Sequence, residues 1–161
     1  MTDELVEKSA WDNRSRDEMS HDEMLEIIAD AHTAVFIRLR GDGHPVGAVV
    51  GSGVIDGEIY TVTNLFRAAY KNVQRDDRCC AVFDIPDVAS VTVIGRAEIV
   101  DDPQLIERLF RMRAPRNALV QKGDLTVDGF LALANTPNRR LFRIVPERFF
   151  SSDQRTLVPQ R

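Results

Sequence analysis

The sequence has few cysteines, no long apolar run and no surplus of basic residues, and each shortage argues against a class of protein. Its two cysteines, Cys79 and Cys80, are adjacent, so they match neither a zinc-binding spacing nor an easily formed disulfide. No apolar stretch approaches the ~20 residues that a membrane-spanning helix requires. The formal net charge of −4 disfavours general nucleic-acid binding, which usually leaves a basic surface.

The first residues also lack the apolar core of a signal peptide, because MTDELVEKSAWDNRSRDE is polar and acidic. We therefore expect a cytoplasmic protein. Residues 1–19 show no clear periodicity and are expected to form a flexible N-terminal arm. The remaining residues, 20–161, have the length and composition of one globular domain, since 43% of the chain is hydrophobic and 29% is charged.

Alternating apolar residues and turn signals predict about six strands. Asp56-Gly57 is a strong hairpin signal, and Gly95 and Pro146 indicate bulges, bends or an edge in the later strands. Short strands between tight turns are typical of an antiparallel sandwich or barrel. The expected strands cover residues 33–40, 45–52, 58–63, 78–84, 90–100 and 140–150.

Helical signals separate some of these strands. Ser20 and Glu23 have the spacing of a capping box, and an apolar face follows them. Asp101-Asp102-Pro103 combines acidic caps with proline in the first turn, which predicts the start of another long helix. The expected helices cover residues 21–32, 66–76, a segment from 103, and a short segment within 124–134.

The order of these parts, over roughly residues 22–150, resembles the flavin- and deazaflavin-dependent oxidoreductases of the pyridoxamine-5′-phosphate-oxidase-like group. The resemblance rests on the Gly41-Asp42-Gly43 turn, on the stretch Lys71 to Arg78 (KNVQRDDR) and on Gly95 to Asp102 (GRAEIVDD). It implies an α+β fold, a six-stranded antiparallel split β-barrel with flanking helices. It also implies a homodimer that holds FMN or coenzyme F-420 in a groove between its subunits.

The resemblance also implies a cofactor site. The second strand would face the cofactor ring, the end of the third strand would lie near the ribityl chain and phosphate, and a basic residue followed by asparagine matches a pair in the family. The residues implied are Val46, Gly47, Ala48, Val49, Thr61, Thr63, Asn64, Arg67, Lys71 and Asn72.

One position departs from the family pattern. Many members carry lysine three positions before that asparagine, where it helps to bind phosphate, and this chain has Ala69 there. Arg67 and Lys71 are the nearby cations that would replace it, because a phosphate dianion needs cations and hydrogen-bond donors. Both are equally consistent with solvated charges on a short helix. In the same way β-propensity accounts for Thr61 and Thr63 without a ligand.

A cluster of four arginines follows in the second long helix and just after it: Arg108, Arg111, Arg113 and Arg116. One interpretation is a solvated helix face paired with Glu107. The other is an electropositive rim for an anionic tail, which coenzyme F-420 has and FMN lacks.

No catalytic pair of side chains is evident, since His21, His32 and His44 have no suitable partners in the sequence, and no metal-ligand spacing occurs. A flavin or deazaflavin carries its own redox chemistry, so the protein need only bind and orient it. We therefore predict an oxidoreductase that moves a hydride to or from a small organic substrate. The alternative is a split-barrel protein that binds a flavin, haem or other flat ligand without turnover.

Overall fold

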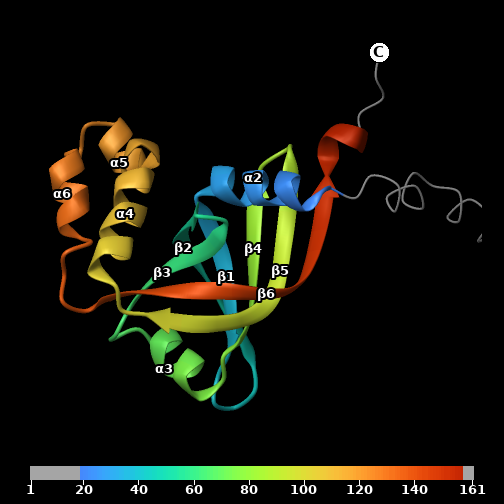
Figure 1. Cartoon of the computed structure of the whole chain (residues 1–161), viewed down its shortest axis with the longest axis horizontal. Coiled ribbons are helices and arrows are strands. Elements are labelled where there is room, and N and C mark those ends of the chain that lie inside the picture. The colour runs from blue at the N-terminus through green and yellow to red at the C-terminus, as the bar shows by residue number, and fades with distance from the viewer. Residues whose placement is uncertain (1–18, 158–161) are drawn as a thin grey trace, which may run out of the picture.

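The computed structural model describes residues 19–157, which form a β-barrel with helices around it (Figure 1). The predicted N-terminal arm, apart from Met19, lies outside the described residues. Between residues 19 and 157, no helix is long and apolar enough to cross a membrane.

Six antiparallel strands close into a barrel in the order β1-β2-β3-β6-β5-β4. All six predicted strands are confirmed, and β2 extends three residues further than expected, up to the Asp56-Gly57 turn. The strands are β1 (Thr33–Leu39), β2 (Pro45–Ile55), β3 (Glu58–Asn64), β4 (Arg78–Ile85), β5 (Ala89–Val100) and β6 (Arg139–Asp153).

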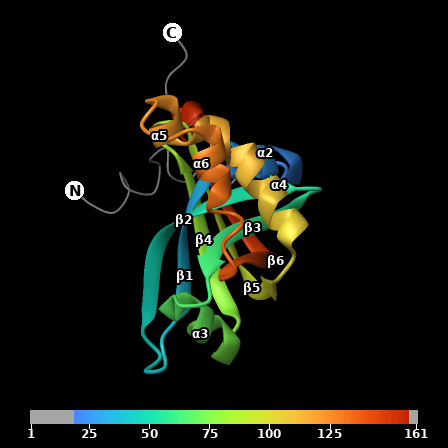
Figure 2. The same ribbon diagram turned by 90° about the vertical axis from the view of Figure 1, so that its left-hand side faces the viewer.

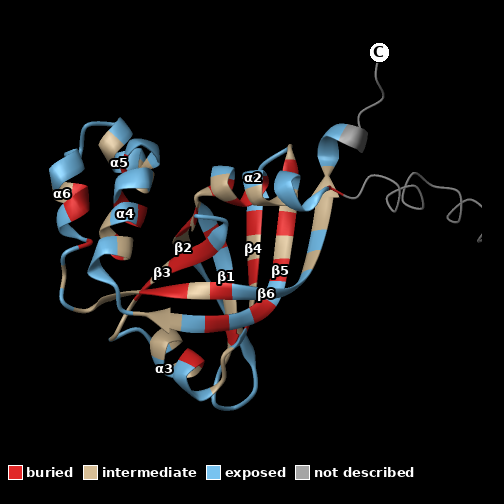
Figure 3. Cartoon of the chain, in the orientation of Figure 1, coloured by how far each residue is buried: buried red, intermediate tan, exposed pale blue. Residues whose placement is uncertain are grey.

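Alternate residues of β1, β4 and β5 are buried and belong to one apolar core inside the barrel (Figure 3). Phe36 of β1 and Phe142 of β6 stack across that interior with ring centroids 5.2 Å apart. The predicted irregularity at Gly95 is confirmed as a register shift between β5 and β6. A Cβ atom at Gly95 would lie 2.1 Å from the Val145 carbonyl oxygen, so the bulge requires glycine.

The barrel is split along one seam. Residues Pro45–Gly51 of β2 pair with β1, but only Ser52–Ile55 pair with β3. The first half of β2 therefore diverges from β3 and is exposed, with Val49 at 73% exposure. Side chains from β1, β2 and β3 line a shared cavity next to this opening, which is described below.

Helix α2 (His21–Ala31) covers one end of the barrel and begins with the predicted capping box between Ser20 and Glu23. Helix α3 (Ala68–Arg75) lies at the other end, between β3 and β4. It starts two residues later than predicted, because the Asn64 side chain accepts a hydrogen bond from the Phe66 N–H and Arg67 remains extended as the N-cap residue.

Three helices between β5 and β6 form a lobe beside the barrel: α4 (Pro103–Arg113), α5 (Ala118–Gln121) and α6 (Val127–Ala132). In both views this lobe lies above α3 (Figure 2). The lobe has its own apolar core, in which Leu109 and Phe110 pack against Leu141 of β6 and the outer face of β2 and β3. The lobe is therefore anchored on the strands that border the split.

Candidate functional site

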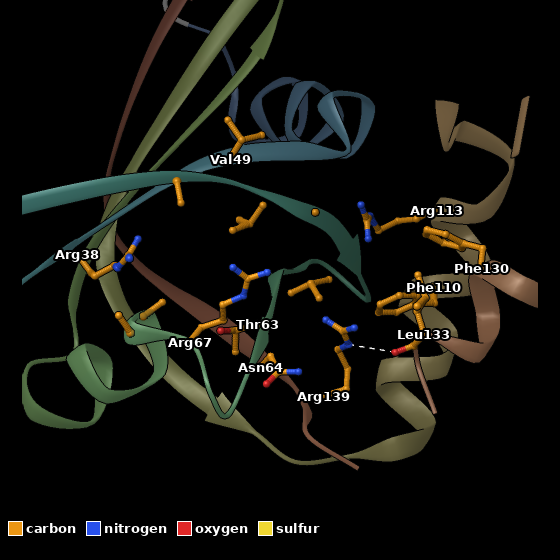
Figure 4. Close-up of a pocket in the computed structure, with 16 residues that line it drawn as sticks. Arg38, Val49, Thr63, Asn64, Arg67, Phe110, Arg113, Phe130, Leu133 and Arg139 are labelled. Carbon is orange, nitrogen blue, oxygen red and sulfur yellow. Dashed lines mark hydrogen bonds between the residues drawn. The ribbon is translucent and has the colours of Figure 1, made fainter. Parts of the chain in front are cut away.

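The split opens into a cavity of about 480 Å³ between the barrel and the helical lobe (Figure 4). Its wall is formed by β2, the end of β3, the start of α3, and the facing ends of α4 and α6. The lining residues are Arg38, Ala48, Val49, Val50, Gly51, Val62, Thr63, Asn64, Arg67, Ala68, Ala69, Phe110, Arg113, Phe130, Leu133 and Arg139.

Four of these lining residues are arginines, and none of the described lining residues is acidic. They come from four separate elements: Arg38 from β1, Arg67 from the N-cap of α3, Arg113 from the end of α4 and Arg139 from the start of β6. Because guanidinium groups stay charged at all ordinary pH values, the cavity carries a fixed positive potential. We call these four residues the arginine pocket.

Arg113 is held between β2 and two aromatic rings. Its guanidinium carbon lies 5.8 Å from the ring centroids of both Phe110 and Phe130. A Cβ atom at Gly51 would lie 2.1 Å from that carbon, so the missing side chain of Gly51 provides the space for the guanidinium. Burial, and then the neighbouring Arg139, lower the pKa of Arg113, and its buried Nε has no hydrogen-bond partner among the described residues.

Arg139 is held nearby by a hydrogen bond to a backbone carbonyl and by a contact with an aromatic ring. Its Nε donates a hydrogen bond of 3.1 Å to the Leu133 carbonyl, and its guanidinium carbon lies 5.4 Å from the Phe110 centroid. Burial, and then the charge of Arg67, lower the pKa of Arg139. Several positive charges therefore lie close together at this end of the cavity. The groups packed against Arg113 and Arg139 are aromatic rings rather than carboxylates.

Arg38 occupies the opposite end of the cavity from Arg113 (Figure 4). Its side chain leaves β1 on the barrel-interior side and is only 9% exposed. Burial lowers its pKa, and its Nε and Nη1 atoms have no partner among the described residues.

The start of α3 adds backbone donors to the cavity. Arg67, its N-cap residue, makes no capping hydrogen bond through its side chain, and Ala68 and Ala69 of the first turn line the wall. The first N–H groups of a helix have no partner within the helix and favour anions. Thr63 and Asn64 at the end of β3 border the same place.

Five of the ten residues predicted from the resemblance lie together in this cavity: Ala48, Val49, Thr63, Asn64 and Arg67. Val46 and Gly47 lie beside it on β2. Thr61 is fully buried with no partner for its hydroxyl among residues 19–157. Lys71 is exposed on α3, and Asn72 accepts hydrogen bonds from Arg75. The cofactor roles of all ten remain predictions.

Of the four clustered arginines in and after α4, three have protein partners on the surface. Arg108 pairs with Asp56, Arg111 pairs with Glu107, and Arg116 bonds the Ala29 carbonyl and Asp30. Only Arg113 of that group lines the arginine pocket. Sequence reasoning did not identify Arg38 and Arg139 as site residues.

A second groove of about 470 Å³ lies between α2 and β3, β5 and β6. It also contains an arginine, Arg143, but this side chain donates hydrogen bonds to both Glu58 and Glu98. The charge of Arg143 is thus compensated by two carboxylates, so this groove lacks the uncompensated positive charge of the arginine pocket.

The chemistry available in the arginine pocket is anion binding. Guanidinium groups form charge-assisted, often bidentate hydrogen bonds to phosphate and carboxylate. The described lining residues include no histidine, carboxylate, cysteine or tyrosine, so none of these side chains titrates near neutral pH as a general acid or base.

A family model for pyridoxamine 5′-phosphate oxidase matches residues 20–153. A conserved hypothetical protein from Mycobacterium tuberculosis is 27% identical, with a TM-score of 0.69 over 89% of this chain and 91% of that one. Two more distant structures share the fold: an F420 reductase (17% identity, TM-score 0.57, 83% and 98% covered) and the heme storage protein HutZ from Vibrio cholerae (14%, 0.59, 80% and 92%). No curated protein matches the chain.

Proposed function

Because the chain belongs to the pyridoxamine 5′-phosphate oxidase family, we propose that it is an oxidoreductase that binds FMN or coenzyme F-420 in the arginine pocket. In this proposal the cofactor's phosphate binds the arginines, and a hydride moves between the cofactor and a small organic substrate. The similarity to an F420 reductase supports the deazaflavin, and the family supports the flavin.

The observation that carries the proposal is the uncompensated charge of the pocket. Four guanidiniums line one cavity without a described acidic lining residue, and two of them have buried nitrogen atoms without partners. Buried charges are costly unless an opposite charge accompanies them. A phosphate group would satisfy those donors, so the residues present fit a phosphorylated cofactor.

The rest of the cavity fits a flat ring. Ala48, Val49 and Val62 provide small apolar side chains, and Gly51 adds an open stretch of backbone on β2. A bound flavin or deazaflavin supplies hydride chemistry through its own ring. The contribution of this chain is to bind the phosphate, to orient the ring against β2 and to exclude water.

A homodimer forms part of the proposal. The diverging half of β2 is exposed, and Val49 and Val35 place apolar side chains on the same outer surface. An exposed apolar strand next to a ligand cavity is a common place for a subunit contact. Light scattering at micromolar concentration tests this, and a monomer there would contradict a site shared between subunits.

The second candidate is a protein that binds a flat ligand without turnover. Its support is the lack of titratable acid–base side chains in the cavity, together with the shared fold of a heme storage protein. Haem fits these residues less well than a flavin, because the described lining includes no histidine, cysteine, methionine or tyrosine to ligate iron.

Titration of the purified protein with FMN and with coenzyme F-420, followed by fluorescence and by Tm, tests the proposal. Ligand binding to the folded state raises stability by about 2.7 kcal/mol at 100 times Kd. We expect micromolar or tighter binding of one cofactor and at least about tenfold weaker binding of its form without phosphate. Equal binding with and without phosphate would contradict the proposed site.

Turnover separates the two candidates. The protein with its bound cofactor reduced under anaerobic conditions is mixed with candidate acceptors, and reoxidation is followed by absorbance. Reoxidation that depends on the acceptor supports an oxidoreductase. A cofactor that stays reduced with every acceptor supports the binding protein.

A further inference from the structure

Two buried hydroxyl groups face each other at the rung where β2 begins to pair with β3. Ser52 and Thr61 are ladder partners there, so their side chains lie on the same face of the sheet. Both residues are 0% exposed. Neither the Ser52 Oγ nor the Thr61 Oγ1 has a hydrogen-bond partner within the part of the chain that the structure describes. A hydroxyl group that leaves water without gaining a partner destabilises the folded state.

The side chains around this pair offer no donor or acceptor. The ladder partner of Thr61 in β6 is Phe142, whose ring stacks on Phe36 in the barrel core. The next rung on the same face of β2 and β3 joins Val54 to Ile59, and both belong to or pack against that core. The two hydroxyl groups are therefore a polar pair at the border of an apolar interior, and a third polar group is needed to complete them.

The two strands diverge directly beyond this rung, so no further pair of residues closes the space on that side. Gly51 pairs with Thr33 of β1 but has no partner in β3. On the same face of β3 as Thr61, Thr63 lines the cavity of the arginine pocket. The hydroxyl pair thus lies between the dry core and the cavity, at a place that a very small molecule can reach.

We propose that Ser52 and Thr61 bind one internal water molecule, which bridges their hydroxyl groups where the barrel begins to split. The ligand is water because both oxygens are buried, and internal waters bind where buried polar groups would otherwise lack partners. Each hydroxyl can donate one hydrogen bond and accept others, so one water can serve both. This site is separate from the four arginines and does not depend on the proposed function.

A shared water predicts a result that two other arrangements do not. If each hydroxyl group bound its own water, removing both hydroxyls would remove two waters. If the two hydroxyls bonded each other directly, removing either would remove none. A shared water is lost when either hydroxyl is removed, and the double variant then loses no more than each single variant.

The experiment counts long-lived internal waters in the ligand-free protein, residues 1–161, by oxygen-17 magnetic relaxation dispersion. The wild type is compared with Ser52→Ala, Thr61→Val and the double variant, and Thr61→Ser tests whether a retained hydroxyl retains the water. Thr92→Val is the matched control, because it makes the same change on the half-buried outer face of β5. Differences between variants isolate this site from any other internal water.

We expect Ser52→Ala, Thr61→Val and the double variant each to lose one water relative to the wild type, and Thr61→Ser and Thr92→Val to lose none. Denaturant unfolding supplies a second readout. Each single variant leaves the other hydroxyl buried without its bridge, whereas the double variant removes both hydroxyls. The unfolding constant of the double variant should therefore lie at least about twofold below the value expected from multiplying the two single effects.

An unchanged water count in Ser52→Ala or Thr61→Val, a loss of two waters in the double variant, or an equal loss in Thr92→Val would overturn the proposal. A crystal structure of the wild type tests the site without any substitution, should a variant fail to fold. We expect an ordered water within about 3.2 Å of both hydroxyl oxygens. A direct hydrogen bond between the two hydroxyls in that structure would also overturn the proposal.

Discussion

Substituting Gly51 by alanine displaces Arg113 without changing any charge. The new Cβ atom would lie 2.1 Å from the guanidinium carbon and Nη2, and 2.3 Å from Nη1. Ordinary contacts between such atoms are about 3.5 Å, so the guanidinium must move by more than about 1 Å. The backbone at Gly51 is a regular β-strand with ladder partner Thr33, which alanine can adopt.

The size of the effect follows from this displacement. Hydrogen bonds tolerate only about 0.5 Å of variation in length, so a shift of about 1 Å breaks a bond to a fixed phosphate. Losing one charge-assisted bond costs about 1.5–3 kcal/mol, or about 10- to 150-fold in affinity. Stability should change little, because alanine gains about 0.4–1 kcal/mol through the unfolded state and displaced cation–π contacts cost a similar amount.

The assay is a titration of wild type and Gly51→Ala with FMN, coenzyme F-420 and inorganic pyrophosphate, alongside denaturant unfolding. Gly53→Ala is the matched control, since its Cβ would meet the buried Leu109 at 2.7 Å and Gly53 does not line the cavity. We expect that control to lose about 1–3 kcal/mol of stability by overpacking while keeping its affinity. Wild-type affinity in Gly51→Ala would refute the role of Arg113.

Three further predictions concern single side chains. Arg67→Met should weaken phosphate-dependent cofactor binding more than Lys71→Met in parallel titrations, because only Arg67 lines the cavity; equal losses would contradict this. Burial raises the pKa of the Cys79 thiol to about 12, so maleimide at pH 8 should label this thiol at least about 100-fold more slowly in the folded than in the unfolded protein. Mass spectrometry measures the labelling rate. Rapid labelling of the folded protein would contradict the burial of this thiol. Hydrogen bonds from Arg78 lower the pKa of Asp76 to about 2. Its stabilising contribution is therefore complete above its unfolded pKa near 4 and is lost as pH falls through 2. In this pH range the stability of Asp76→Asn should therefore fall less steeply with decreasing pH than that of the wild type. An acid-unfolding curve identical to that of the wild type would argue against the ion pair between Asp76 and Arg78.

The local parts of the fold were predictable because each depends on residues close together in the sequence. The Ser20–Glu23 capping box, the Asp56-Gly57 turn and the Asp102 N-cap of α4 all form as expected. The start of α3 was predicted two residues too early, since the Asn64 side chain bonds the Phe66 N–H and extends the preceding loop. A competing local hydrogen bond of this kind has no distinctive pattern in the sequence.

The arginine pocket was only partly predictable, because barrel closure brings its members together from distant segments. Arg38 and Arg139 are separated by about one hundred positions, and no motif connects them. One signal was present: Arg38 has the same alternation phase as Ala34 and Phe36, which places a charge on an inward apolar face. Arg113 was noted only within a charged cluster, whose other members pair at the surface.

The glycines of β2 are a second feature of the sequence that relates to the site, but their role can be interpreted only once the position of the helical lobe is known. Gly51 and Gly53 share one face of the strand, and their missing side chains admit Arg113 and Leu109 of α4. A repeated glycine on one face of a strand predicts a close approach, but the approaching element has to be known from the fold.

The position of the phosphate in a crystal structure with bound FMN or coenzyme F-420 tests the central claim most directly. We predict phosphate oxygens within hydrogen-bonding distance of at least two guanidiniums of the arginine pocket, with the ring along Ala48 to Gly51 of β2. A phosphate bound outside this cavity, for example at the groove around Arg143, would contradict the account.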